Sequence, residues 1–207
     1  AYYDMGARFA KWRMVVNIDE NDTPTDEALK VNCIMMARYA QIAQASNIVP
    51  IVEPEVIHAG DHSLSKAEMV TTRTLQILFQ TLLEYKVDMA GLILKSSMVL
   101  AGDVHPNQTS AEEVAQATLR TFHMSVPHEC AGIVFLSGGQ TPERSTENLN
   151  AIAKMGAQPW PITFSFSRAL EQPVLDAWGG KPENADAAKA ALLEVTKQNS
   201  AASLGQL

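Results

Sequence analysis

Cysteine is scarce in this sequence, and so are the motifs that cysteine usually forms. The chain has 207 residues and two cysteines, Cys33 and Cys130, and neither lies in a Cys-x-x-Cys motif or beside a histidine cluster. A zinc site is therefore disfavoured and nothing requires a disulfide. We expect a reducing compartment, the cytoplasm.

Long hydrophobic runs and an excess of positive charge are also missing. No apolar run reaches the roughly 20 residues of a membrane span, and the net charge of −7 argues against a broad surface for nucleic acid or anionic membranes. The content of 46% hydrophobic and 19% charged residues is typical of a globular protein, so we expect one domain over residues 1–207. The first residues lack a signal-peptide pattern and a start methionine, so we expect the natural chain to begin upstream.

Histidine spacing that would indicate a metal site is absent as well. The sequence has five histidines, and no two of them have ligand spacing on one helix face. We interpret them as structural or surface residues and expect no metal and no cofactor.

Short apolar runs alternate with helical patterns along the whole chain. Strands are predicted at 7–16, 47–56, 89–98, 131–140 and 161–170. Helices are predicted at 24–45, 65–86, 110–124, 143–155 and 183–197. Two of these helices open with a Ser-x-x-Glu capping box, at Ser65 and at Ser110. Repeated strand–helix units of this length indicate parallel strands joined by helical crossovers.

Two architectures fit such units, an open doubly wound sheet and a (β/α)8 barrel. Polar or charged residues cluster at the C-terminal ends of all five predicted strands, and in a barrel those ends converge on one mouth, where the active site lies. No Gly-x-Gly-x-x-Gly loop follows any strand, which weakens an open dinucleotide-binding sheet. We therefore predict an α/β fold of the TIM-barrel type, of which this chain supplies about the last five strand–helix units.

Charged residues near the ends of the first three predicted strands form a candidate site. Lys95 ends an apolar run, Lys11 and Arg13 share one strand face, and Glu53 and Glu55 share another. If these faces point into the barrel, a desolvated amine could attack a carbonyl and form a Schiff base, with a carboxylate for the proton transfers. The alternatives are a solvated lysine at a strand end, a surface loop opened by Glu-Pro-Glu, and a surface pair of basic residues.

Polar residues and glycines at the C-terminal ends of the last two predicted strands indicate an anion site. In the segment SGGQ, Gly138 and Gly139 permit a backbone nest after Ser137, whose N–H groups cradle a phosphate. Arg168, with Ser165 before it, would supply the other half of a phosphate clamp. The alternatives are an ordinary turn at the two glycines and a solvent-facing arginine at a helix start.

Taken together, these segments resemble one family, the class I (Schiff-base) fructose-1,6-bisphosphate aldolases. The resemblance covers the whole chain, in the family's order and spacing, through eight motifs: GARFAKWR, IVPIVEPE, GDHSL, LILKSSM, GIVFLSGGQ, NLNAIAKMG, PWPITFSFSRAL and AWGGKPEN. It implies a cytoplasmic, homotetrameric lyase of glycolysis and gluconeogenesis. That enzyme reversibly cleaves fructose 1,6-bisphosphate into dihydroxyacetone phosphate and glyceraldehyde 3-phosphate.

The resemblance also implies a role for each candidate residue. Lys95 would be the Schiff-base lysine, Glu53 the general acid/base for carbinolamine dehydration, and Glu55 the carboxylate that supports the lysine network. Lys11 would polarise and orient the substrate near the cleaved bond, and Arg13 would bind the far phosphate. The phosphate at the dihydroxyacetone end would be bound by Ser137, Gly138, Gly139, Ser165 and Arg168.

Four residues depart from the family's usual pattern. Ser96 and Ser97 follow the lysine where the family has proline and asparagine, and Phe166 and Ser167 replace a tyrosine and a glycine. A serine at 167 would cost backbone freedom if a positive φ were required there. The family's first three strands and its long tail ending in tyrosine are absent from the sequence.

Two alternative functions stay open at this point. The four departures are compatible with a catalytically weakened barrel that binds phosphosugars or serves as a scaffold. A different Schiff-base barrel, such as a transaldolase or a deoxyribose-phosphate aldolase, lacks the paired Glu-Pro-Glu and SGGQ pattern.

Overall fold

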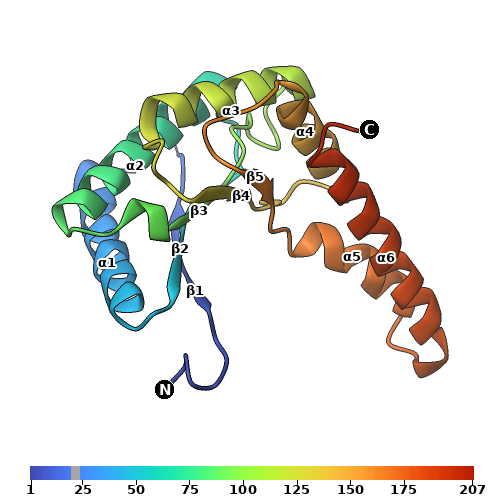
Figure 1. The fold of residues 1–207 in the computed structure, drawn as a ribbon. Helices are drawn as coiled ribbons and strands as arrows, with labels where there is room; N and C mark the ends of the chain where they lie inside the picture. Colours follow the sequence, from blue (N-terminus) through green and yellow to red (C-terminus); the bar gives the residue numbers. More distant parts are fainter. Residues whose placement is uncertain (20–23) are drawn as a thin grey trace.

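A parallel sheet of five strands forms the centre of the computed structural model, which describes residues 1–19 and 24–207 (Figure 1). The strands are β1 (Phe9–Val16), β2 (Val49–Val56), β3 (Ile93–Ser96), β4 (Gly132–Phe135) and β5 (Ile162–Phe164). They pair in the order β1-β2-β3-β4-β5, and every pairing is parallel. Each strand adds to the same side of its predecessor, as in a barrel wall, with no reversal of order as in a doubly wound sheet. The chain therefore provides five strand–helix units of a TIM-barrel fold.

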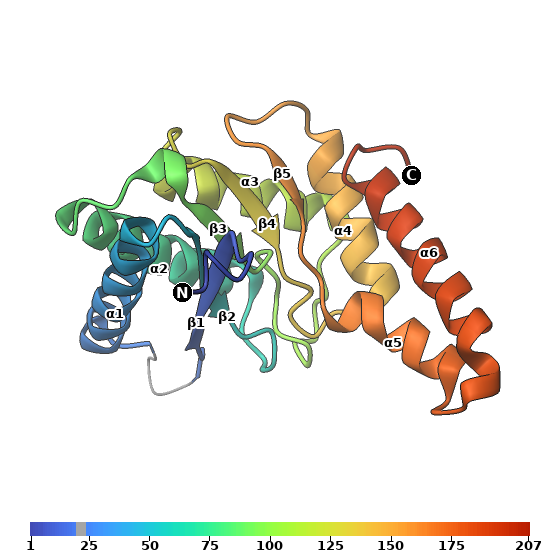
Figure 2. The same ribbon diagram turned by 60° about the horizontal axis from the view of Figure 1, so that its bottom comes forward.

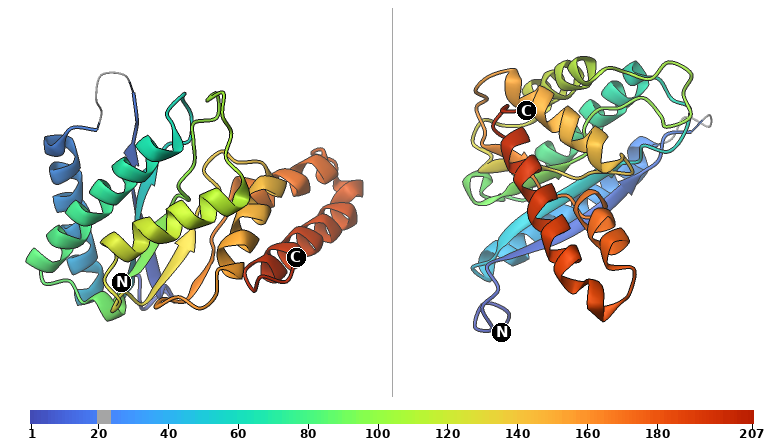
Figure 3. Two further views of the ribbon diagram at one scale, coloured as in Figure 1. Left: turned by 90° about the horizontal axis from the view of Figure 1, so that it is seen from above. Right: turned by 90° about the vertical axis from the view of Figure 1, so that its right-hand side faces the viewer.

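Six α-helices and two short 3₁₀ helices connect and follow the described strands. They are α1 (Asp26–Ala45), α2 (Leu64–Glu84), η1 (Met89–Gly91), α3 (Ala111–Ser125), α4 (Pro142–Lys154), α5 (Arg168–Trp178), η2 (Pro182–Asn184) and α6 (Ala185–Ala202). Helices α1 to α4 lie along the convex side of the curved sheet, and its concave side is uncovered (Figures 1 and 2). Helices α5 and α6 lie side by side beyond β5 (Figure 3). No helix in the described ranges has the length and apolar character needed to cross a membrane.

The hydrophobic core fills the layer between the sheet and α1 to α4. Its buried residues show which side chains of each strand point toward the helices. Val52 of β2 and Leu94 of β3 are fully buried. Phe135 of β4 stacks on Phe122 of α3, with ring centroids 5.7 Å apart. Because side chains alternate along a strand, the neighbours of these core residues point to the concave side. Trp12 of β1 faces the helices by the same rule, since its ring lies 5.6 Å from that of Tyr39 on α1.

Three of the predicted strands are too long, and the one predicted at 131–140 ends at Phe135 as β4. Residues 89–91 form the 3₁₀ helix η1, in which the Asp88 side chain accepts a hydrogen bond from the Ala90 N–H at 3.0 Å, so β3 begins only at Ile93. The strand predicted at 161–170 ends at Phe164, and α5, which the sequence pattern did not predict, begins at Arg168.

The capping box predicted at Ser65 is wrong, whereas the one at Ser110 is confirmed. Helix α2 begins two residues earlier, where the Ser63 side chain accepts a hydrogen bond from the Lys66 N–H at 3.2 Å. At α3, the Ser110 hydroxyl accepts from the Glu113 N–H at 3.2 Å, and the Glu113 carboxylate accepts from the Ser110 N–H at 2.8 Å.

Candidate active site

Five charged side chains from three neighbouring strands meet on the concave side of the sheet. Lys11 and Arg13 come from β1, Glu53 and Glu55 from β2, and Lys95 from β3. The parallel register aligns Arg13 with Glu53, so the charges of β1 and β2 lie opposite one another. These are the five charged residues that the alternation of side chains along the predicted strands grouped into one candidate site.

The carboxylate of Glu53 lies between two lysine amines. Lys11 Nζ is 2.6 Å from Glu53 Oε2, and Lys95 Nζ is 3.3 Å from Glu53 Oε1. The side chain of Lys95 is only 12% exposed and that of Glu53 only 5%, whereas Lys11 is 41% exposed. Low exposure weakens solvent screening and so strengthens the interaction of the charges. A mostly buried amine, a carboxylate that can exchange protons with it and a second cation are therefore in contact.

A second ion pair lies beside the first. Arg13 Nε is 2.5 Å from Glu55 Oε2, and the Glu55 side chain is 9% exposed. This hydrogen bond raises the pKa of the Arg13 guanidinium above its ordinary value, and the negative charges of Glu55 and Glu53 act in the same direction. In the described part of the chain, the ion pair of Glu55 is thus with the arginine and not directly with either lysine.

The SGGQ segment is a tight turn. The N–H of Gln140 donates to the carbonyl of Ser137 at 3.1 Å, and the φ angles of Gly138 and Gly139 are 56° and 91°. Two consecutive positive φ angles are characteristic of a type I′ turn and explain the two glycines. Within the described residues, no backbone hydrogen bond uses the N–H of Gly138 or Gly139. The turn is therefore compatible with the predicted anion site, because both N–H groups are available to a ligand.

Ser165 and Arg168 lie past the end of the neighbouring strand, and both are exposed. The Ser165 N–H donates to the Phe135 carbonyl at 2.8 Å and so extends the pairing of β5 with β4. The structure therefore brings Ser165 to the strand end next to the SGGQ turn, and Arg168 begins α5. Their predicted contact with phosphate stays a prediction.

The cost predicted for a serine at position 167 does not arise. Ser167 has a φ of −107°, so the positive φ that would favour glycine does not occur there. Phe166 is buried, and its ring lies 5.5 Å from that of Phe164.

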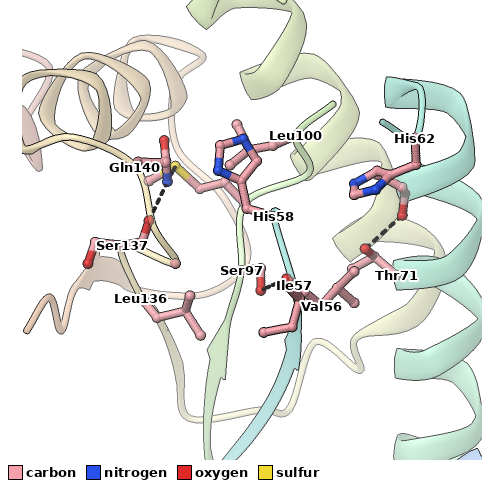
Figure 4. A pocket seen from close by; sticks show the side chains of 13 residues that line it. Val56, Ile57, His58, His62, Thr71, Ser97, Leu100, Leu136, Ser137 and Gln140 are labelled. Atoms are coloured by element: carbon pink, nitrogen blue, oxygen red, sulfur yellow. Dashed lines mark hydrogen bonds between the residues drawn. The ribbon is translucent and has the colours of Figure 1, made fainter. Parts of the chain in front are cut away.

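A small pocket lies beside the C-terminal ends of β2, β3 and β4 (Figure 4). It has an empty volume of about 310 Å³, and its lining includes Ser97, Ser137 and two histidines, His58 and His62. Burial lowers the pKa of both histidines, so both are neutral at pH 7. The Nδ1 atom of His62 is buried without a hydrogen-bond partner in the described part of the chain.

Sequence reasoning did not identify this pocket, although the spacing of GDHSL after Glu-Pro-Glu places His62 near a strand end. In residues 1–19 and 24–207, no group of three or more His, Cys, Asp or Glu side chains is arranged to hold a metal ion.

Comparison with known proteins gives one consistent result. The family described as "Fructose-bisphosphate aldolase class-I" matches residues 1–207. The chain is 45% identical to "Fructose-bisphosphate aldolase 4, cytosolic" of Arabidopsis thaliana, over 99% of this chain and 52% of that protein. It is 46% identical to "Probable fructose-bisphosphate aldolase class 1" of Xanthomonas campestris, over 99% of this chain and 61% of that protein.

A solved structure agrees with the sequence comparison. The fructose-bisphosphate aldolase of Plasmodium falciparum, in complex with TRAP and a small-molecule inhibitor, matches with a TM-score of 0.97 at 43% identity. The match covers 99% of this chain and 59% of that one. The chain therefore spans a little over half the length of these relatives.

Proposed function

Because the chain belongs to the class-I fructose-bisphosphate aldolase family, we propose that the protein reversibly cleaves fructose 1,6-bisphosphate through a Schiff base on Lys95. The products are dihydroxyacetone phosphate and glyceraldehyde 3-phosphate. The observation that carries this proposal is the Glu53 carboxylate between the amines of Lys95 and Lys11, at 3.3 Å and 2.6 Å.

Lys95 supplies the nucleophile and Glu53 the proton transfers. The uncharged amine attacks the ketone carbon of the substrate and forms a carbinolamine, which loses water to give the imine. Each of these steps needs a proton delivered or removed, and Glu53 lies within reach of the lysine nitrogen. With a side chain only 12% exposed, Lys95 is shielded from bulk water that would compete for these protons.

The protonated imine then accepts the electron pair of the breaking carbon–carbon bond. The aldehyde product leaves as its hydroxyl loses a proton, and the remaining enamine is reprotonated before hydrolysis frees the lysine. Lys11, paired with Glu53, places a positive charge near the oxygen atoms that change charge in these steps. Glu55 holds Arg13 next to this group.

Two phosphate contacts hold the substrate across the site. Arg13 uses Nε for Glu55, which leaves its two terminal amino groups to bind the far phosphate. Ser137, the N–H groups of Gly138 and Gly139, Ser165 and Arg168 bind the phosphate at the dihydroxyacetone end. The available N–H groups of the type I′ turn support this assignment.

The proposal extends to location and assembly. A cytoplasmic location is supported by the relative that is named cytosolic. A homotetramer follows from the family resemblance and is tested by the mass of the protein in solution.

The alternative of a catalytically weakened scaffold has less support. Ser167 needs no positive φ, and the hydroxyls of Ser96 and Ser97 both donate hydrogen bonds at 3.0 Å. The serines that motivated this alternative are thus accommodated while Lys11 and Lys95 keep their ion pairs with Glu53.

Turnover of fructose 1,6-bisphosphate by the natural full-length protein tests the proposed function. The wild type is expected to release both triose phosphates, and Lys95→Met is expected to abolish their release. Lys189→Met is the matched control, because it removes a lysine that pairs with Asp186 on exposed helix α6. Failure of the wild type to cleave the bisphosphate, or full activity of Lys95→Met, would contradict the proposal.

A further inference from the structure

The pairing of β2 with β3 stops just before the residues proposed to be catalytic. These strands pair only at Ile51 with Ile93 and at Val52 with Leu94, one residue before Glu53 and Lys95. By contrast, β1 pairs with β2 over all eight residues of each strand. The backbone ladder therefore does not by itself fix the distance between Glu53 and Lys95.

Ser97 makes a buried contact between the two strands beyond that point. Its hydroxyl donates a hydrogen bond to the carbonyl of Val56, the last residue of β2, at 3.0 Å (Figure 4). Ser97 is only 6% exposed, so losing the hydroxyl would leave the carbonyl without a partner in a mostly dry environment. An unsatisfied buried group is costly, and the strand ends would shift to reach another partner.

The loops after these strands are joined further out. The Gly102 N–H donates to the His62 carbonyl at 2.8 Å, and the Gly60 N–H donates to the Asp103 carboxylate at 2.9 Å. A Cβ atom on Gly102 would lie 2.0 Å from the Gly60 carbonyl oxygen, so the loops touch there backbone to backbone. Ser97 thus lies between the last paired residues of β2 and β3 and this outer contact between the loops. The Lys95–Glu53 ion pair lies on the same part of the two segments.

We propose that Ser97 is a positioning residue for the Lys95–Glu53 pair. Its hydroxyl holds the end of β3 against the end of β2 and so sets the 3.3 Å separation of the amine and the carboxylate. The catalytic consequence rests on the proposed function, whereas the geometric role does not. Proton transfer between two groups depends steeply on their separation, so a small displacement reduces the rate of the chemical steps.

Ser96 provides a matched control inside the same strand. Its side chain is also buried, and its hydroxyl donates to the Ser97 carbonyl at 3.0 Å. That bond lies within one strand and does not span β2 and β3. Replacing Ser96 by alanine therefore removes a buried hydroxyl without removing the contact between the strands.

The test compares Ser97→Ala, Ser97→Thr and Ser96→Ala in the natural full-length protein. Ser97→Ala is expected to lower kcat about tenfold or more with KM within about twofold, because the chemical steps and not phosphate binding are affected. Ser97→Thr keeps the hydroxyl and is expected to retain activity. Ser96→Ala is expected to keep the wild-type kcat, whatever its melting temperature.

A measurement without substrate separates this inference from the proposed function. The rate at which an amine-specific reagent labels Lys95 is followed against pH by peptide mass spectrometry. Ser97→Ala is expected to change this profile, and Ser96→Ala is not. This comparison decides the role of Ser97 even if the wild type does not cleave the bisphosphate.

Two results would overturn the inference. One is a wild-type kcat and labelling profile in Ser97→Ala. The other is an equal effect of Ser96→Ala and Ser97→Ala on both measurements, which would indicate a general loss of packing. Should Ser97→Ala not fold, Ser97→Cys keeps a side chain of similar size with a weak donor, and the same outcomes apply to it.

Discussion

Glu53 contacts both lysines of the site, although its position in the sequence distinguishes it little from Glu55. Its two carboxylate oxygens each face a different amine, at 2.6 Å and 3.3 Å, whereas Glu55 pairs with Arg13. Alternation along β2 predicted that the two glutamates share a face. It did not predict which one reaches the lysines, because that depends on the register of three strands after folding.

Replacing Glu53 by glutamine is predicted to impair the chemistry more than the binding. Glutamine keeps the shape but cannot exchange protons, and a general acid/base contributes typically 10²–10⁴-fold to a rate. We expect kcat to fall by about 10²-fold or more with a small change in KM. Steady-state kinetics check this, with Glu68→Gln as control because Glu68 pairs with Arg120 away from the site. An unchanged kcat would remove Glu53 from the mechanism.

The neutral histidines of the pocket beside the ends of β2, β3 and β4 predict a dependence of stability on pH. Burial lowers the pKa of His58 and His62, and the nearby charges of Asp103 and Arg144 modify it in opposite directions at His58. Unfolding restores a pKa of about 6.5, so below that pH the unfolded state binds more protons than the folded state. The stabilisation is therefore complete above about pH 6.5 and is lost as the pH falls through the lower pKa of the folded state.

Thermal unfolding between neutral and mildly acidic pH checks this prediction. The melting temperature is expected to fall as the pH drops, and the double variant His58→Asn and His62→Asn is expected to show a shallower dependence. An equally steep dependence in the double variant would assign the effect to other groups.

At the scale of single elements, the start of α2 distinguishes two nearby serines. Ser63 caps the helix through the Lys66 N–H, whereas Ser65 lies inside it and is exposed. Ser63→Ala is therefore predicted to lower the free energy of unfolding by about 1 kcal/mol, the usual value for a lost N-cap. Ser65→Ala is predicted to change it by less than about 0.5 kcal/mol, as for an ordinary surface substitution. Urea unfolding of both variants checks this, and the reverse order would restore Ser65 as the cap.

The elements that sequence predicted well are those with long, regular patterns. Strands β1 and β2 each begin within two residues of their predicted starts, because apolar residues recur at every second position on the face that packs on the helices. The start of α5 was missed because TFSFS alternates like a strand. Pairing with β4 ends just after Phe164, at the Ser165 N–H, and the chain then turns into a helix. Ser97 was likewise unpredictable, because its partner lies 41 residues away in sequence.

At the scale of the whole molecule, the outer strands determine how residues 1–207 behave in isolation. Each of β1 and β5 pairs on one side only within the described residues, and Phe9 and Val15 of β1 are 65% and 48% exposed. Unpaired parallel edges with apolar side chains promote association. We therefore predict that a protein consisting only of these residues aggregates or unfolds without cooperativity. Sedimentation and calorimetry check this, and a monomer with a single cooperative transition would contradict it.

The order of the strands in the sheet also explains why the residues of the site could be predicted better than the distances between their charged atoms. A parallel sheet with sequential strand order brings the carboxyl ends of all strands to one edge. Polar residues at those ends are therefore neighbours, whichever rotamers their side chains adopt. The resemblance to a family then assigned chemistry to those residues. Which oxygen meets which nitrogen depends on side-chain packing, for which the linear sequence has no direct signal.

Chemical trapping of the imine is the direct test of whether Lys95 forms the covalent intermediate. The natural full-length protein is treated with dihydroxyacetone phosphate and borohydride, which reduces an imine to a stable amine, and the labelled peptide is located by mass spectrometry. A single adduct on Lys95 is expected, and it is expected to be lost in Lys95→Met. An adduct on another residue, or none under conditions where the protein is folded, would contradict it.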